Sequence, residues 1–241
     1  MNVPLSLPLS VPGGRTLVLD LDGTLIDTVP DLAAALNRLM RARGLDGFTL
    51  AETAAMVGDG VARLVGRAFV ARGRTADAAD VAEYSADYSA HAVEASRLFP
   101  GVADTLGRMA AEGWGLAVCT NKPEAPARAL LRAFGLEGLI RTVGGGDSFP
   151  VRKPDPRHLL ATLAAAGGSA DRAVMVGDHA NDVAAATGAG LPCIFAAWGY
   201  GPPEMAAGAA ATATGFSEVP ELARALLVRR AAPAGQEAPP R

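Results

Sequence analysis

The acidic segment Asp20-Leu21-Asp22-Gly23-Thr24 directly follows the apolar run at residues 16–19 and carries side chains able to do chemistry. Residues two apart on an extended chain point to the same side. At the carboxyl end of a strand in an open α/β sheet, they would stand where ligands bind. A turn at Gly23 can bring both carboxylates to one reacting group, so that Asp20 or Asp22 attacks while the other transfers a proton. The alternative from this segment alone is an acidic loop that caps a helix.

Three further polar clusters follow strand-like runs or open a helix. Thr120-Asn121-Lys122 follows the apolar run at residues 116–119, and the sequence GDHAND at residues 177–182 follows the run at 172–176. Between them, residues 152–156 (RKPDP) open a helical segment. A hydroxyl donor, a lysine and a second acidic pair at strand ends are the groups that would bind a phosphate and a metal ion.

These four clusters, in this order, resemble the haloacid-dehalogenase superfamily of phosphohydrolases, and the resemblance covers residues 15–195. It implies that Asp20 attacks phosphorus to form an aspartyl-phosphate, and that Asp22 serves as general acid and then as general base. It also implies a Mg²⁺ ion held by Asp20, the backbone carbonyl of Asp22 and Asp178, with Asp182 orienting these ligands or Lys153. The phosphate-binding residues it implies are Gly23, Thr24, Thr120, Asn121 and Lys153.

Three side chains within the clusters have competing interpretations. Taken alone, Lys153 reads as a solvated loop lysine, and only its position between the Thr120 and Asp178 clusters assigns it to the reaction. Lys122 either joins the site or simply begins the following helix. We expect His179 to face solvent at a helix start, because a single histidine without matching ligands does not make a zinc site.

The hydrophobic pattern predicts an α/β fold with a doubly wound, mostly parallel sheet, because strand-like runs alternate with helical periods from residue 100 onward. Helical spacing without β-alternation between Pro30 and Leu98 predicts a small all-helical cap inserted after the first strand. A module so placed can close over the site and exclude water, and it resembles the small helical cap of one branch of the superfamily. The predicted division is a core at 15–29 and 99–230, a cap at 30–98, and disordered segments at 1–14 and 231–241.

The individual elements follow from the same periodicities and from the glycines and prolines that interrupt them. Strands are predicted at 16–19, 116–119, 141–143, 173–176 and 192–195. Helices are predicted at 30–43, 50–57, 61–72, 76–96, 102–112, 124–134, 156–166, 180–187 and 220–229.

Composition narrows the class of protein. Half of the 241 residues are hydrophobic, which is ample for a buried core, and the formal net charge of -3 argues against a nucleic-acid partner. No run approaches the ~18 apolar residues that cross a membrane, and the first residues do not read as a secretory signal. We expect a cytoplasmic monomer or homodimer that acts on a small phosphorylated metabolite, with Cys119 and Cys193 as buried thiols.

A glycine-flanked turn in the predicted cap is the candidate for substrate selection. The free N–H groups at Gly58-Asp59-Gly60 open a helix and can bind an anion, and Arg63 and Arg67 lie one turn apart on one face. The alternative is an ordinary interhelical turn with solvated arginines. The turn is similar to that of bacterial phosphoglycolate phosphatases, which implies 2-phosphoglycolate as substrate, selected by Gly58, Asp59, Gly60 and Arg63. That similarity rests on residues 57–69, 99–102, 144–147 and 152–156.

Other functions fit parts of this pattern. The enzyme could hydrolyse another small phosphorylated metabolite, or act as a β-phosphoglucomutase-like phosphotransferase, which shares the acid pair and the cap. A dehalogenase is less expected, because it needs neither Asp22 nor a metal ligand at Asp178. A receiver-type signalling domain also uses aspartates, a threonine and a lysine. Its phospho-acceptor, however, belongs on a middle strand of a chain of ~120 residues, whereas Asp20 ends the first strand.

Overall fold

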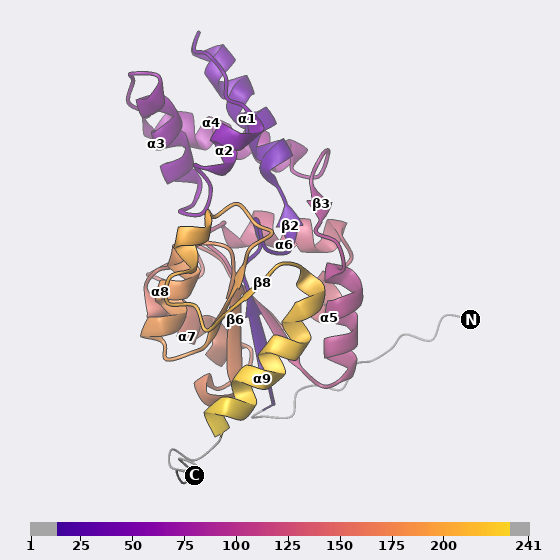
Figure 1. Ribbon diagram of the computed structural model, residues 1–241. Helices are drawn as coiled ribbons and strands as arrows, with labels where there is room; N and C mark the ends of the chain where they lie inside the picture. The colour runs from indigo at the N-terminus through magenta and orange to yellow at the C-terminus, as the bar shows by residue number, and fades with distance from the viewer. Residues whose placement is uncertain (1–13, 232–241) are drawn as a thin grey trace, which may run out of the picture.

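A six-stranded parallel sheet forms the centre of the computed structural model, which describes residues 14–231 (Figure 1). The strand order is β5-β4-β1-β6-β7-β8, and each neighbouring pair is parallel. The predicted doubly wound sheet is therefore confirmed. The strands are β1 (Thr16–Leu19), β4 (Gly115–Cys119), β5 (Thr142–Gly144), β6 (Ala173–Gly177), β7 (Cys193–Ala196) and β8 (Ala211–Ala213).

Both faces of the sheet are buried, which explains why its strands read as nearly continuous apolar runs. Along β1, Leu17 and Leu19 pack into one hydrophobic cluster and Val18 into the other, because successive side chains point to opposite faces. The first face is covered by α5 (Val102–Ala111), α6 (Glu124–Ala133) and α9 (Val219–Ala231), and the second by α7 (Pro156–Ala165) and α8 (Ala180–Gly188).

A separate helical layer lies beyond the carboxyl end of β1, at the top of Figure 1. It contains α1 (Val29–Ala42), α2 (Leu50–Ala54), α3 (Val61–Ala71) and α4 (Ala78–His91). Two short antiparallel strands join it to the core: β2 (Ile26–Asp27) and β3 (Arg97–Leu98), with Ile26 opposite Leu98. We call residues 30–98 the cap, although its last two residues are strand rather than helix.

Most predicted elements agree with the structure to within two residues at each end, and two cap helices are shorter than predicted. The helix α4 begins at Ala78 because Asp77 and Asp80 form a capping box. It ends at His91 rather than at Ser96, and beyond it the N–H groups of Ala95 and Ser96 each donate to the Asp31 carboxylate at 2.8 Å. The helix α2 ends at Ala54 rather than at residue 57.

The edge strand β8 was not predicted, because Ala211–Ala213 is short and alanine-rich and gives little strand signal. Short 3₁₀ helices at Glu137–Leu139, Ala170–Arg172, Pro203–Ala206 and Phe216–Glu218 complete the described chain. The predicted disordered segments lie almost wholly outside the described residues, and Ala231 is the last residue of α9.

The two cysteines and the lengths of the helices bear on two further predictions. Cys119 and Cys193 are buried free thiols, as predicted. Within residues 14–231, no helix combines the length and the apolar composition that crossing a bilayer would require.

Candidate active site

Three predicted clusters meet at the middle of the sheet because their strands are neighbours. β1 pairs on one side with β4 and on the other with β6. Asp20, Thr120 and Asp178 each follow the end of one of these strands. The chain passes from β1 to β4 on one side and later returns to β6 on the other. The site therefore lies where the strand order reverses, the usual ligand site of an open α/β sheet.

Lys153 is buried among carboxylates instead of lying in solvent. Its side chain is completely buried, and Nζ lies 2.9 Å from Asp20 Oδ1 and 2.6 Å from Asp182 Oδ1. Burial alone would lower the pKa of Lys153, but the negative charges of Asp182 and Asp20 outweigh it and raise the pKa above its usual range. The lysine is therefore a fixed positive charge beside the predicted nucleophile, and the alternative of a solvated loop lysine is wrong.

His158 holds the loop that carries this lysine. Its Nδ1 accepts a hydrogen bond from the Lys153 backbone N–H at 3.2 Å, which leaves Nε2 to donate to the Gly145 carbonyl at 3.0 Å. Burial lowers the pKa of His158, and the nearby Lys153 charge lowers it further. A neutral ring matches these two bonds, because one nitrogen accepts and the other donates.

Asp182 lies one helical turn after Asp178 and orients the lysine. It accepts hydrogen bonds from Lys153 Nζ and, at 3.1 Å, from the backbone N–H of His179. Burial raises the pKa of Asp182, the charges of Asp20 and Asp178 raise it further, and Lys153 partly offsets them. Its contacts agree with the supporting role that the family resemblance implies.

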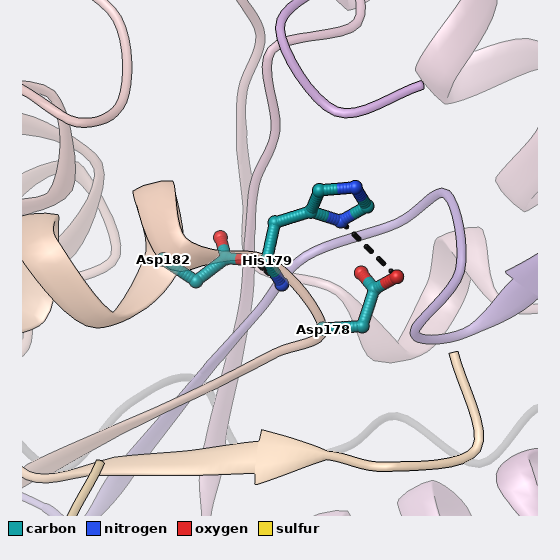
Figure 2. A group of neighbouring side chains, drawn as sticks. All are labelled: Asp178, His179 and Asp182. Atoms are coloured by element: carbon teal, nitrogen blue, oxygen red, sulfur yellow. Dashed lines mark hydrogen bonds and ion pairs between the residues drawn. The ribbon is translucent and has the colours of Figure 1, made fainter. Parts of the chain in front are cut away.

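Asp178 is completely buried, and three groups contact its carboxylate. The Thr24 hydroxyl donates to Oδ1 at 3.2 Å, the Tyr200 backbone N–H donates to Oδ2 at 2.8 Å, and His179 Nδ1 lies 3.1 Å from Oδ2 (Figure 2). Burial lowers the pKa of His179, but the hydrogen bond and charge of Asp178 outweigh it and raise the pKa to about 9.

The expectation that His179 faces solvent is wrong, because the cap turn covers it. The His179 side chain is only 9 % exposed. A Cβ added at Gly58 would lie 2.7 Å from His179 Nε2, so this turn presses its backbone against the imidazole. Only glycine permits such an approach.

The donor set fits a hard divalent cation. Asp178, His179 and Asp182 each offer a ligand atom within 4.8 Å of the others (Figure 2). Mg²⁺ takes oxygen ligands, and the histidine nitrogen is already bound to Asp178. The buried carboxylates of Asp20, Asp178 and Asp182 outnumber the two cations beside them, Lys153 and the protonated His179, and this excess negative charge suits Mg²⁺.

Asp22, the predicted acid and base, is held by two side chains. The Thr28 hydroxyl donates to Asp22 Oδ1 at 2.6 Å, and Lys122 Nζ lies 3.0 Å from the same oxygen. Lys122 is buried, and its Nζ stands 4.5 Å from the ring centre of Tyr88 on α4. Burial lowers the pKa of Lys122, but Asp22 and Tyr88 raise it above its usual range. Lys122 therefore joins the site, and α6 begins only at Glu124.

Thr120 and Asn121 retain the groups that phosphate binding requires. The Thr120 hydroxyl oxygen accepts from the Lys122 N–H at 3.2 Å, and its own hydrogen remains available to donate. Asn121 Nδ2 donates to the carbonyls of Gly58 and Lys153, both at 3.0 Å. The predicted phosphate contact of Asn121 would therefore involve its backbone N–H, because its side chain ties the cap turn to the Lys153 loop.

The cap turn itself docks on the core. Gly58 and Gly60 adopt φ values of +114° and +86°, which favour glycine. Asp59 pairs with Arg67, which also donates to the Met56 carbonyl at 2.9 Å. Arg63 has an exposed side chain and does not line the cavity beneath the turn, so its part in substrate selection stays a prediction.

A small cavity of about 30 Å³ lies between core and cap. The cap turn therefore lies close to Asp20 and Asp22, with little space between them. The cavity is lined by Asp20, Asp22, Leu32, Val57, Gly58, Gly60, Val61, Leu64, Thr120, Asn121 and Lys122.

Several residues at the site were missed from the sequence. Asn181 Nδ2 donates to the Gly58 carbonyl at 2.9 Å and so reinforces the docking of the cap turn. Thr28 and Tyr200 contact Asp22 and Asp178 from segments that gave no motif. The available signal for Tyr200 was its place between two glycines just after β7, at the same edge of the sheet.

Comparison with known proteins agrees with this geometry. The family model of haloacid dehalogenase-like hydrolases matches residues 15–190. A phosphoglycolate phosphatase from Rhodospirillum rubrum is 43% identical over 194 residues, 77% of this chain and 80% of that protein. One from Caulobacter vibrioides is 39% identical over 225 residues, 91% of this chain and 95% of that protein. The crystal structure of a predicted phosphoglycolate phosphatase from Haemophilus somnus superposes with a TM-score of 0.79 at 28% identity, covering 87% of this chain and 97% of that one. The chain belongs to the haloacid dehalogenase-like hydrolase family.

Proposed function

We propose that this enzyme is a Mg²⁺-dependent phosphatase that converts 2-phosphoglycolate to glycolate and phosphate through an aspartyl-phosphate on Asp20. It is a phosphoric monoester hydrolase, as its relatives are. The observation that carries the mechanism is the buried Asp20 carboxylate, 2.9 Å from Lys153 where β1, β4 and β6 end together. The substrate rests on relatives named phosphoglycolate phosphatase, two of which match 77% and 91% of this chain.

In the first step, an oxygen of Asp20 attacks phosphorus and the alkoxide of glycolate leaves. Lys153 offsets the negative charge that otherwise repels the incoming phosphate. The Thr120 hydroxyl and the Asn121 backbone N–H donate to the phosphoryl oxygens. A Mg²⁺ ion, held by Asp20, the Asp22 carbonyl and Asp178, would supply further charge neutralisation.

Asp22 transfers the protons. It protonates the leaving oxygen and then removes a proton from the water that hydrolyses the intermediate. The Thr28 hydroxyl and Lys122 hold its carboxylate in place, because both contact Oδ1. Since Thr28 starts the first cap helix, the orientation of Asp22 depends on how the cap is seated.

The lining of the cavity supports a small substrate. The cap side chains there are apolar, namely Leu32, Val57, Val61 and Leu64, and they offer no partners for the hydroxyl groups of a sugar. This favours a two-carbon acid over the sugar phosphate of a β-phosphoglucomutase-like reaction. Hydrolysis of another small phosphorylated metabolite, a cytoplasmic location and a monomer or homodimer remain predictions.

Lys122 is the better candidate to hold the substrate carboxylate. Among the described residues that line the cavity, Lys122 alone carries a positive charge. Its ammonium has three hydrogens; the Asp22 carboxylate and the Tyr88 ring account for two directions. The third can donate to a ligand in the cavity, whereas Arg63 lies outside the lining.

Replacing Lys122 or Arg63 by an uncharged side chain shows which of the two binds the substrate carboxylate. We expect Lys122→Met to lower kcat/KM for 2-phosphoglycolate about 10- to 150-fold more than for p-nitrophenyl phosphate, which has no carboxylate. Damage to Asp22 would also fall more heavily on 2-phosphoglycolate, because p-nitrophenolate leaves without being protonated. The same ratio measured for Thr28→Val, which removes a hydrogen bond to Asp22 and keeps Lys122, is therefore the baseline. If Arg63→Ala gives the selective loss instead, the arginine is the carboxylate ligand; equal losses on both substrates in both variants contradict carboxylate recognition by either.

Removing the metal tests the proposed reaction itself. Treatment with EDTA should abolish release of phosphate from 2-phosphoglycolate, and added Mg²⁺ should restore it, because the acidic site lacks the charge to accept a phosphate dianion. Phosphate release is measured before and after chelation. Full activity in a metal-free preparation contradicts the mechanism, and a lasting phospho-adduct without turnover would favour the receiver-type alternative.

A further inference from the structure

One residue after β7 contacts both the metal-site carboxylate and the hinge of the cap. The Tyr200 backbone N–H donates to Asp178 Oδ2 at 2.8 Å. At the other end of the side chain, the hydroxyl donates to Asp27 Oδ1 at 2.8 Å. The same oxygen accepts from the backbone N–H groups of Thr28 at 2.7 Å and Val29 at 3.2 Å. Tyr200 thus spans from the core site to the first linker of the cap.

The phenol oxygen of Tyr200 caps the N-terminus of α1. The first N–H groups of a helix lack partners within it, and the side chain of the N-cap residue usually accepts from them. Thr28 is the N-cap of α1, but its hydroxyl donates to Asp22. Tyr200 Oη accepts from this end of α1 in its place, so the start of the cap helix is fixed by a core residue.

The loop that carries Tyr200 packs directly against Asp178. A Cβ added at Gly199 would lie 2.6 Å from Asp178 Cγ, so the backbone of the loop touches this side chain directly. Trp198 Nε1 donates to the Thr24 carbonyl at 3.1 Å and fastens the same loop to the segment after β1. A displacement of Asp178 would therefore disturb this loop.

The buried carboxylate of Asp31 connects the two linkers of the cap, the one before α1 and the one that leads into β3. Asp31, in the first turn of α1, accepts from the N–H groups of Ala95 and Ser96 at 2.8 Å each, and from the Ser96 hydroxyl at 2.6 Å. These residues immediately precede β3. A movement at the start of α1 would therefore act on both linkers.

We propose that Tyr200 is a positioning residue that couples occupancy of the metal site to the hinge of the cap. Ion binding at Asp178 shifts the Tyr200 loop, and the hydroxyl transmits the shift to Asp27, Thr28 and Val29. The inference rests on the Mg²⁺ site of the proposed function. It adds to that function a route by which the loaded site favours the closed cap.

Hydrogen exchange at the hinge amides tests this coupling without measuring activity. Exchange at Thr28 and Val29 is followed with and without Mg²⁺ in the wild type and in Tyr200→Phe, while calorimetry measures Mg²⁺ affinity. We expect Mg²⁺ to slow exchange at both amides in the wild type. Tyr200→Phe should exchange about 2- to 10-fold faster at these amides, as loss of one hydrogen-bond acceptor implies. It should lose the response to Mg²⁺ yet still bind the ion, because its backbone N–H remains on Asp178.

The matched control is Tyr84→Phe. Tyr84 is also buried, and its hydroxyl donates to the Leu32 carbonyl at 3.3 Å, so the variant loses one tyrosine hydrogen bond away from Asp178. It should keep the Mg²⁺ response at Thr28 and Val29. If Tyr200→Phe does not fold, Asp27→Asn weakens the same hydroxyl contact and should reduce the response.

The outcomes separate the two proposals. Mg²⁺ binding to the wild type without a response at the hinge amides overturns the coupling and leaves the proposed function intact. A full response retained in folded Tyr200→Phe also overturns it. No Mg²⁺ binding to the wild type overturns the metal site of the proposed function and the coupling with it.

Discussion

Asp20→Asn should reduce turnover of 2-phosphoglycolate by a factor on the order of 10⁴–10⁶, the scale of loss found when a catalytic nucleophile is removed. The amide keeps the shape of the side chain but has no anionic oxygen to attack phosphorus. In this variant Lys153 still contacts Asp182 Oδ1 at 2.6 Å, so its buried ammonium keeps one carboxylate partner. Initial rates of phosphate release, at saturating Mg²⁺, measure the effect.

Thermal unfolding of the Asp20→Asn variant serves as its control. A folded variant that turns over within ten-fold of the wild type would show that Asp20 is not the nucleophile. A large loss of stability would instead point to the Asp20–Lys153 pair as a structural contact, since removing one partner of a buried pair leaves the other charge less compensated.

Asp22→Asn should slow hydrolysis by roughly 10²–10⁴-fold, the usual contribution of general acid–base catalysis. The nucleophile is intact, so an ester with a good leaving group, such as p-nitrophenyl phosphate, can still phosphorylate Asp20. Hydrolysis of the intermediate also needs Asp22 and should become slow. The expected result is a burst of p-nitrophenol followed by a slow steady rate, recorded by rapid mixing.

A second variant shows whether Asp22 transfers protons itself or only helps to position other groups. A variant at Thr28, which donates to Asp22 Oδ1, gives the comparison: Thr28→Val removes the hydrogen bond but keeps the carboxylate. It should lose less activity than Asp22→Asn. Equal rates for Asp22→Asn and the wild type on 2-phosphoglycolate would contradict the assignment of Asp22.

The core of the site was predictable because its geometry follows from periodicity. Apolar runs identify buried strands, parallel strands end at one edge, and polar residues at those ends must converge. The convergence of Asp20, Thr120 and Asp178 follows from their positions after three such strands. Lys153 needed the order of the clusters, because its segment precedes α7 rather than following a strand directly.

The parts that were not predicted depend on contacts between distant segments. Tyr200 meets Thr28 across 172 positions, and Lys122 meets Asp22 across 100. The strands β2 and β3 have two residues each, too few to show a period. His179 was expected in solvent because it precedes α8, but burial there is set by the cap turn at Gly58.

Identification of the phosphorylated residue during turnover tests the central claim most directly. The wild-type enzyme is mixed with 2-phosphoglycolate and Mg²⁺, quenched in acid within the first turnovers, and digested for mass spectrometry. The account predicts a phosphoryl group on Asp20 and its absence in the Asp20→Asn variant. A phosphoryl group on any other residue, or rapid hydrolysis with no phospho-enzyme under single-turnover conditions, would contradict it.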